Sequence, residues 1–247
     1  MKKRDIFYAT LALLLVWQLA SWIVNKSILP APWKVIIVFF EELFNGNMPK
    51  HALASLWRVT ASMFLSVILA APAGLALGQS KQLNRIFSPV IYLLYPIPKV
   101  VLVPVILLFL GIGDLAKITI IFLILFFQIL VLVRDQAAAL PAELIQSVRS
   151  LGAGRRALFR FVYLPASLPA ILTALRQSVG TAVAVLYITE TFATQLGLGY
   201  YIYFNASILF NYPAMYAGVI AVSLLGLGLY FSVDWVEKKL CQWQFVN

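Results

Sequence analysis

Residues 141–165 read PAELIQSVRSLGAGRRALFRFVYLP, a charged and amphipathic segment inside a chain that is otherwise almost entirely apolar. The apolar spacing predicts a helix over residues 142–151, which Gly152 then breaks. One face of this helix carries the apolar residues Leu144, Ile145, Val148 and Leu151. We expect a segment of this kind to contact another molecule or another part of the protein.

A second short amphipathic run follows Gly152, and we expect Pro165 to close it. Its apolar side consists of Ala157, Leu158, Phe161 and Val162. Its basic side consists of Arg155, Arg156 and Arg160.

The composition indicates an integral membrane protein. Of the 247 residues, 62% are hydrophobic and 11% are charged, and the mean hydropathy is +0.93, values that a water-soluble domain could not sustain. Crossing the hydrocarbon core takes roughly 20 apolar residues. Six windows qualify: 6–24, 59–77, 86–111, 118–133, 168–188 and 214–233. The sequence therefore predicts an all-α polytopic protein whose residues 1–247 form one transmembrane domain.

The first window is expected to be a signal anchor. A cleaved signal peptide is the alternative, because Lys2, Lys3 and Arg4 precede the window. The apolar run is too long for a normal signal peptide, however, and no small-x-small cleavage site follows it.

The positive charges predict the orientation, because cytoplasmic loops retain lysine and arginine. One side of the spans holds most of these residues, including both termini and residues 141–165, which should therefore be cytoplasmic. The opposite side holds Lys26, Lys34, Lys50, Arg58 and Lys117. The net charge of +10 thus reflects topology, and nothing in the sequence indicates nucleic-acid binding.

Catalytic and metal sites lack the residues they would need. Cys241 is the only cysteine and His51 the only histidine. No disulfide, thiolate metal site, multi-histidine metal site or histidine-containing triad is plausible. A membrane enzyme is therefore weakly supported.

The sequence also allows predictions for individual segments and polar residues outside residues 141–165. Residues 35–44 suggest a short helix along the outer membrane surface. Asp114 and Lys117 are expected in an outer surface turn, while Arg176 should reach the membrane boundary, a partner chain or a neighbouring loop. Near the end of the second span, close packing against another helix is predicted by the small residues Ala70, Ala71, Ala73, Gly74, Ala76 and Gly78.

The third span is unusual because prolines and a lysine interrupt it. Irregular backbone at this depth is tolerated only against protein or a water-filled cavity. Lys99 should therefore find a carbonyl, a carboxylate, water or a passing anion, or else extend to the interface. One interpretation is a translocation path lined by Tyr95, Pro96, Pro98, Lys99 and Glu190. Glu190 opens the aromatic segment 190–213, either an interfacial anchor or a gate on the outer side.

Residues 141–165 resemble the signature loop of binding-protein-dependent ABC transporter permeases, in which an EAA triplet, a glycine and an I-x-L-P ending are regularly spaced. Gly152, Val162, Leu164 and Pro165 match, whereas Gln146, Ser147 and Val148 replace the triplet. The stretches 51–58, 72–81, 95–114 and 190–200 extend the resemblance over nearly the whole chain. They are similar to the subgroup that imports nitrate, sulfonates, taurine and bicarbonate, and that also includes importers of pyrimidine vitamin precursors, riboflavin and phthalate-type compounds.

The resemblance implies that residues 141–165 are the coupling helix that docks on an ATPase subunit. The residues it assigns to this contact are Gln146, Ser147, Val148, Leu151, Gly152, Ala153, Arg156, Val162, Leu164 and Pro165. It also implies a second permease chain, most simply in a homodimer, two ATPase copies and an extracytoplasmic solute-binding protein. No GxxxxGK[ST] loop occurs in the sequence, so ATP and magnesium are expected in the partner ATPase, and no cofactor in this chain.

The expected function is import of a small solute across the inner membrane, and an oxyanion such as nitrate, a sulfonate or taurine suits the basic outer side. A heteroaromatic vitamin precursor or an aromatic carboxylate is the alternative substrate. A channel or ion-coupled carrier using Lys99, Asp114 and Glu190 is a more distant alternative. The sequence lacks the inverted repeats expected of such a carrier, and this alternative gives no role to residues 141–165.

Overall fold

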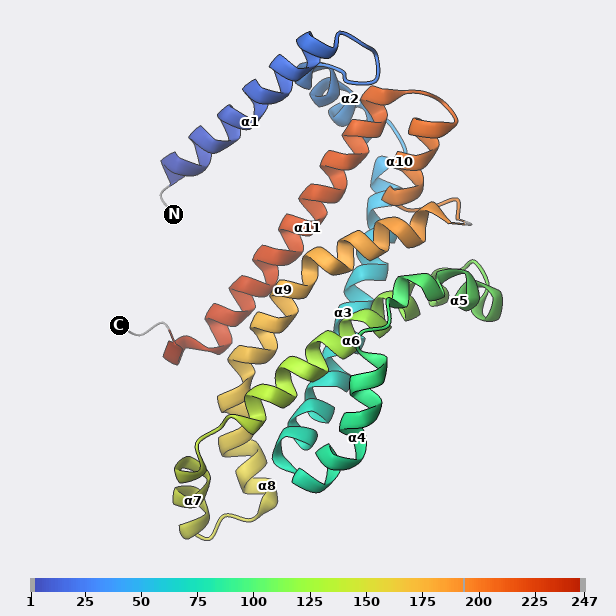
Figure 1. Cartoon of the computed structure of the whole chain (residues 1–247). Coiled ribbons are helices and arrows are strands. Elements are labelled where there is room, and N and C mark those ends of the chain that lie inside the picture. The colour runs from blue at the N-terminus through green and yellow to red at the C-terminus, as the bar shows by residue number, and fades with distance from the viewer. Residues whose placement is uncertain (1–2, 193, 245–247) are drawn as a thin grey trace. The chain divides into compact units, whose positions relative to one another are not determined.

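A computed structural model describes residues 3–192 and 194–244, and all regular structure in these residues is helical (Figure 1). The α-helices are α1 (Lys3–Val24), α2 (Pro32–Phe44), α3 (Met48–Gln79), α4 (Lys81–Leu94), α5 (Val103–Leu110), α6 (Asp114–Ala138), α7 (Ala142–Ser150), α8 (Arg155–Leu158), α9 (Leu164–Thr191), α10 (Leu198–Ser207) and α11 (Tyr212–Leu240). Short turns of tighter or wider helix are η1 (Lys99–Leu102), η2 (Phe159–Tyr163) and η3 (Gln242–Gln244).

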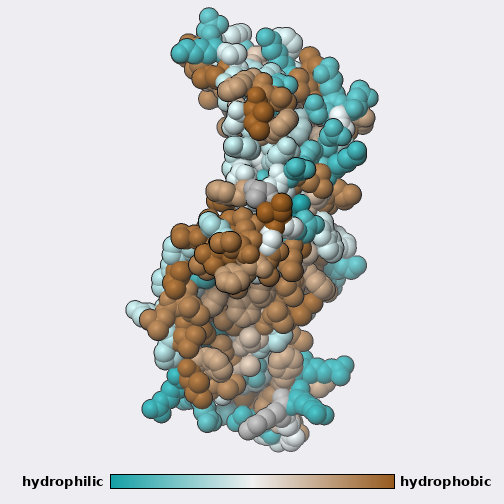
Figure 2. Space-filling model, turned by 90° about the vertical axis from the view of Figure 1, so that its right-hand side faces the viewer, coloured by the Kyte–Doolittle hydropathy of each residue, from teal (hydrophilic) through white to brown (hydrophobic). Residues whose placement is uncertain are grey.

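The predicted spans are confirmed. Five helices of the described chain are long and apolar enough to cross a membrane, and α4 with the η1–α5 segment forms a sixth candidate that bends by 74°. This bend confirms the irregular third span. Figure 2 shows hydrophobic side chains over a broad area of one face, as expected for helices that contact lipid.

The chain divides into two compact units, of which the first contains residues 1–56 and 190–225. Its core joins Val35 of α2 and Met48 of α3 to Leu198 and Tyr201 of α10 and to small residues of α11. The helix predicted over residues 35–44 is therefore present as α2. It begins three residues earlier, at Pro32, and its Val35 is fully buried.

The second unit contains residues 57–189 and 226–247, and is organised by the pairing of α3 with α6. Ser62 and Ser66 donate hydrogen bonds to the carbonyls of Ile118 and Phe122, at 3.2 and 3.3 Å. Each pair is separated by 56 residues in sequence, and so is the ion pair of Arg58 with Asp114. A constant difference in residue number means that the two helices run parallel.

Glycines continue this seam at the same four-residue spacing. A Cβ atom on Gly74 would lie 2.9 Å from the carbonyl oxygen of Leu130, and one on Gly78 would lie 2.5 Å from that of Arg134. The close helix packing predicted from the small residues is confirmed. The α3–α6 seam, defined by Ser62, Ser66, Ala70, Gly74 and Gly78, is the rigid centre of the second unit.

Two expectations for polar residues were wrong. Lys117 is fully buried rather than in a surface turn, and its amine donates to the carbonyls of Ile112 and Gly113, at 2.6 and 3.3 Å. Arg176 pairs with Asp234 of α11, at 2.7 Å, and with Glu237, at 3.2 Å, rather than with a boundary or a loop. In both cases burial of the polar group is offset by partners within the unit.

The second run of residues 141–165 also differs from its prediction. Pro165 does not close a helix, because α8, the π-helical turn η2 and α9 follow one another without a break. A π turn adds a residue, which rotates the positions after it. Phe161 is consequently 69% exposed, while Val162 and Tyr163 are buried. The side chain of Arg155 lies outside the described residues.

Candidate functional site

Residues 141–165, which the resemblance assigns to coupling, form an elbow in the second unit, and we call this segment the coupling elbow after that expectation. Its first helix is α7, which ends one residue earlier than predicted. Gly152 follows with φ +84°, a left-handed conformation that only glycine adopts without steric cost. On the inner side, Ile145 and Val148 pack against a buried cluster of Leu158, Val162 and Tyr163. This cluster fixes the angle between α7 and α8.

The outer side of the coupling elbow is unusually apolar for a polar segment. Leu151 is 85% exposed, Phe161 69% and Leu144 43%. A shallow cavity of about 290 Å³ lies between α7 and the start of α9, and Trp243 near the chain's end also lines it. Exposed large apolar residues grouped on one projection are typical of a docking surface.

The other residues assigned to the elbow by resemblance lie around this surface. Gln146 and Ser147 are exposed on α7, and Arg156 is exposed on α8. Ala153 is half-buried against the cluster. Leu164 and Pro165 begin α9 directly after the π turn, and because the helical segment is continuous there, the missing proline N–H leaves a carbonyl of the preceding turn without its backbone donor.

Lys99 lies at the bend of the third span, where its amine caps backbone carbonyls at the end of α4. Its amine donates to the carbonyls of Leu94, Tyr95 and Ile97, at 2.8, 2.9 and 3.2 Å, and lies 4.6 Å from the centre of the Phe127 ring. Pro98 lacks the N–H group that would donate to the Leu94 carbonyl in a continuous helix, so this carbonyl accepts instead from the Ile97 N–H, at 3.3 Å, and from Lys99. The expectation that Lys99 finds a carbonyl is confirmed. Tyr95, Pro96 and Pro98 are exposed.

Glu190 lies in the first unit and is fully buried. Its carboxylate accepts hydrogen bonds from the Ser55 hydroxyl, at 2.8 and 2.9 Å to its two oxygens, and from the Gly199 N–H, at 2.9 Å. A carboxylate at the first N–H groups of a helix stabilises that helix, here α10. Gly197 precedes α10 with φ +126°, and its Cα packs so closely on Glu190 that no side chain fits there.

Sequence reasoning missed two members of this cluster. Ser55 also accepts the Leu198 N–H at 2.8 Å, and the Gly197 N–H donates to His51 Nδ1 at 3.1 Å. The signal was present, because His51 and Ser55 are four residues apart and so share one face of a predicted helix. Polar side chains aligned in apolar surroundings need hydrogen-bond partners, and Glu190 is a polar residue of an apolar stretch that could serve as one.

Comparisons with known proteins identify the family of the chain. Residues 62–242 match the family described as binding-protein-dependent transport system inner membrane component. The chain belongs to this family.

Two relatives and one solved structure illustrate what the chain is similar to. The chain is 28% identical to the taurine transport system permease protein of Escherichia coli (strain K12), and the alignment covers 95% of the chain and 88% of that protein. The chain is also 33% identical to a putative ABC transporter permease protein of Methanocaldococcus jannaschii, and this alignment covers 93% of the chain and 88% of that protein. An inward-facing structure of the MetNI methionine ABC transporter superposes with a TM-score of 0.67 and 20% identity, covering 78% of the permease and 95% of that chain. This last likeness shows that the fold is shared.

The chain is thus a multi-pass inner-membrane transport permease rather than an enzyme. The expected family, subgroup and all-α architecture are confirmed. The roles of the individual residues in the coupling elbow and at the bend stay predictions.

Proposed function

We propose that this permease works as a homodimer in an ATP-driven importer, with the coupling elbow docked on a partner ATPase and both termini in the cytoplasm. The observation that supports this proposal is the elbow itself, whose Leu144, Leu151 and Phe161 are exposed while its inner side packs on the cluster of Leu158, Val162 and Tyr163. ATP and magnesium would bind to the ATPase, present in two copies, and a solute-binding protein would deliver substrate from the other side.

Gly152 offers a direct test with a matched control. Gly152 and Gly154 are both exposed and a Cβ on either would lie in open space, but only Gly152 has a positive φ. Gly152→Glu should therefore distort the elbow, whereas Gly154→Glu adds the same charge without backbone strain. We expect Gly152→Glu to insert normally and to lose most ATP-driven uptake in vesicles that contain the partner ATPase. Full uptake by Gly152→Glu, or equal loss in both variants, would contradict the coupling role.

The second permease copy is supported by one face of α9. Its outward residues are Gln177, Gly180, Ala184 and Tyr187, which we call the α9 open face. By contrast, the outward face of α11 in the same unit carries Leu227, Phe231 and Trp235, each more than half exposed. Large apolar residues suit lipid, while small and polar residues in a span suit another helix or water. We assign the α9 open face to the homodimer axis and the translocation path.

The substrate we propose is a small oxyanion such as a sulfonate, taurine or nitrate. The taurine permease among the relatives supports this class. A heteroaromatic vitamin precursor or an aromatic carboxylate is the second candidate, favoured by the exposed aromatic rings at Tyr203 and Phe210. Competition of radiolabelled taurine uptake by nitrate, an alkyl sulfonate and phthalate separates the two. Inhibition by phthalate alone would overturn the oxyanion assignment.

Lys99 provides a further test of the path. If Lys99 assists an anion, Lys99→Gln should lower uptake of anionic substrates several-fold more than uptake of neutral analogues. Its three carbonyl partners point instead to a cap, for which both losses should be equal. The ratio of the two uptake rates, measured in the same vesicles, distinguishes the alternatives.

A further inference from the structure

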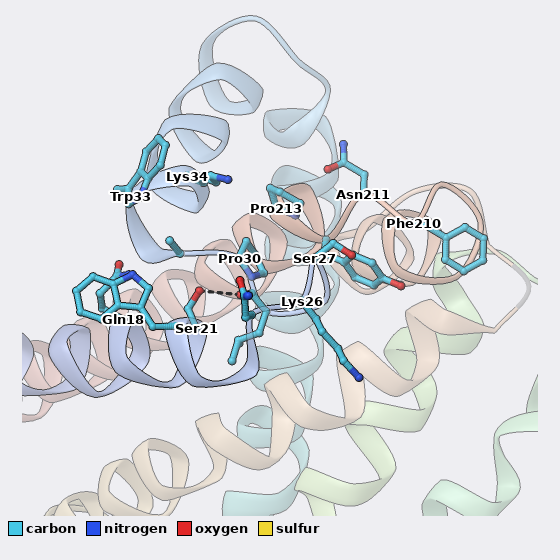
Figure 3. Close-up of a pocket in the computed structure, with 15 residues that line it drawn as sticks. Gln18, Ser21, Lys26, Ser27, Pro30, Trp33, Lys34, Phe210, Asn211 and Pro213 are labelled. Atoms are coloured by element: carbon cyan, nitrogen blue, oxygen red, sulfur yellow. Dashed lines mark hydrogen bonds between the residues drawn. The ribbon is translucent and has the colours of Figure 1, made fainter.

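A cavity of about 560 Å³ with a mixed polar and apolar lining lies in the first unit, where α1 ends, α2 begins and the turn before α11 meets them (Figure 3). No function described above uses this cavity. Residues 18–34 contribute most of its lining and precede residue 62, where the match to the permease family begins. Most of the cavity lining therefore lies outside the matched range, while residues 210–213 lie inside it.

The lining is cationic. Lys26 follows α1 and Lys34 lies in the first turn of α2, and both side chains are exposed. Among the described residues that line the cavity there is no aspartate or glutamate. Figure 3 shows the two amines on different segments: the Lys34 side chain is directed toward the side where Asn211 lies, whereas the Lys26 side chain extends away from Lys34. Two lysines without a carboxylate among them attract an anion.

Hydrogen-bonding groups and indole rings complete the lining. Gln18, Ser27 and Asn211 supply amide and hydroxyl groups, and Trp22 and Trp33 supply rings that are more than half exposed. Tryptophan is typical of the boundary between membrane and water, where its ring lies among lipid headgroups. The cavity occupies that boundary, because the first apolar span ends at Val24 and the polar lining starts beside it.

The backbone around the cavity is held in unusual conformations. Among the described residues, those other than glycine that have a positive φ are Asn25, at 44°, and Phe210, at 52°, and both line this cavity. Asparagine tolerates this region, but phenylalanine is strained there. Strained residues cluster at ligand-binding sites, because the fold must hold them in place.

We propose that this cavity binds the phosphate group of an anionic phospholipid at the boundary after α1. Lys34 contacts the phosphate, and the exposed Lys26 side chain turns toward it on a flexible stem. The amide and hydroxyl groups donate to the phosphate oxygens, and the two indole rings lie beside the glycerol region. A sulfonate or free phosphate has the same tetrahedral oxyanion. The position at the end of an apolar span favours the lipid, whose chains can follow α1 into the membrane.

Native mass spectrometry of the full chain in detergent, titrated with phosphatidylglycerol, tests the site. The decisive variant is Lys26→Gln with Lys34→Gln, for which we expect phosphatidylglycerol affinity to fall about 10-fold, since each lysine near a lipid surface contributes to binding. The matched control is Lys50→Gln, which removes an exposed lysine of the same unit that does not line the cavity. The double variant with arginine at both positions should bind like the wild type.

Two further arms identify the source of the anion. Titration of the same samples with inorganic phosphate and with taurine should not displace phosphatidylglycerol. Displacement at millimolar concentrations, abolished in the double glutamine variant, would show a soluble oxyanion as the occupant and would overturn the lipid assignment. Equal phosphatidylglycerol affinity in the wild type and the double glutamine variant would overturn the site altogether. Unchanged thermal melting in detergent would confirm that the variants are folded.

Discussion

The α3–α6 seam and the α9 open face are both rows of small or polar residues along a membrane-spanning helix, yet they meet different surroundings. In the seam, Ser62 and Ser66 reach carbonyls of α6, and Gly74 and Gly78 touch its backbone. On the α9 open face, a Cβ atom on Gly180 would meet no neighbouring segment within 4 Å, and Gln177 is exposed. One row is filled by the chain itself and the other is open.

The difference teaches that small residues in a span mark helix contacts whether or not the partner belongs to the same chain. Lipid tails are as apolar as leucine, so the hydrophobic effect does not drive helices together inside the membrane. Close approach and hydrogen bonds do, and both require small or polar residues on at least one helix. An open row of this kind therefore indicates a contact that a single chain leaves unmade.

Gly78→Leu should have the largest effect on folding. A Cβ at this position would lie 2.5 Å from the Arg134 carbonyl oxygen and 2.6 Å from Ala137 Cβ, so the helices would have to separate. Leucine is about 1 kcal/mol better than glycine in a helix, but overpacking against backbone costs about 1–3 kcal/mol or more. We expect a clear loss of folded protein, measured as monodisperse yield in detergent. Wild-type yield and melting temperature would show that the seam can open without cost.

Gly180→Leu should separate folding from transport. The Cβ position on Gly180 is open, so the isolated chain should be at least as stable as the wild type, since leucine has the higher helix propensity by about 1 kcal/mol. If the α9 open face forms the dimer axis, the added side chain should reduce dimer and uptake about 10-fold or more, because small residues permit the close approach.

Gly228→Leu is the matched control for this second prediction. Gly228 lies on the outward face of α11 in the same unit, and its Cβ position is equally open. Its neighbours Leu227 and Phe231 are typical of a lipid face, so the variant should transport like the wild type. Cross-linked dimer and taurine uptake, measured side by side for both variants, give the answer. Equal uptake and equal cross-linked dimer for the two variants would contradict the assignment of the α9 open face to the dimer axis.

The fold could largely be predicted from the sequence because hydropathy and small-residue spacing are local signals. The spans, the bend at Pro96 and Pro98 and the close packing at Gly74 follow directly from them. The position of the elbow turn also follows, since Gly152 is where a left-handed residue is needed.

What could not be predicted depends on contacts between distant residues. The burial of Lys117 and the pairing of Arg176 with α11 require partners that hydropathy does not identify. The π turn shifts Phe161 outward through one extra residue, an irregularity with no clear sequence signal. Glu190 was assigned to the translocation path, which stays a prediction, and its hydrogen bonds with Ser55 and with α10 could not be inferred from the sequence, because these partners are distant from it or lie beyond a turn.

The smallest predicted effect concerns the hydroxyl groups of the seam. Ser62→Ala with Ser66→Ala removes two hydroxyls, and the single hydrogen of each is shared between an α6 carbonyl, at 3.2 or 3.3 Å, and a nearer carbonyl of its own helix, at 2.7 Å. Hydrogen bonds between membrane helices average about 0.6 kcal/mol, so the double variant should lose roughly 1 kcal/mol and keep its transport rate. Thermal melting in detergent measures this loss. A loss as large as that of Gly78→Leu would mean that hydrogen bonds rather than close backbone approach hold α3 on α6, and would change what the open row on α9 requires of its partner.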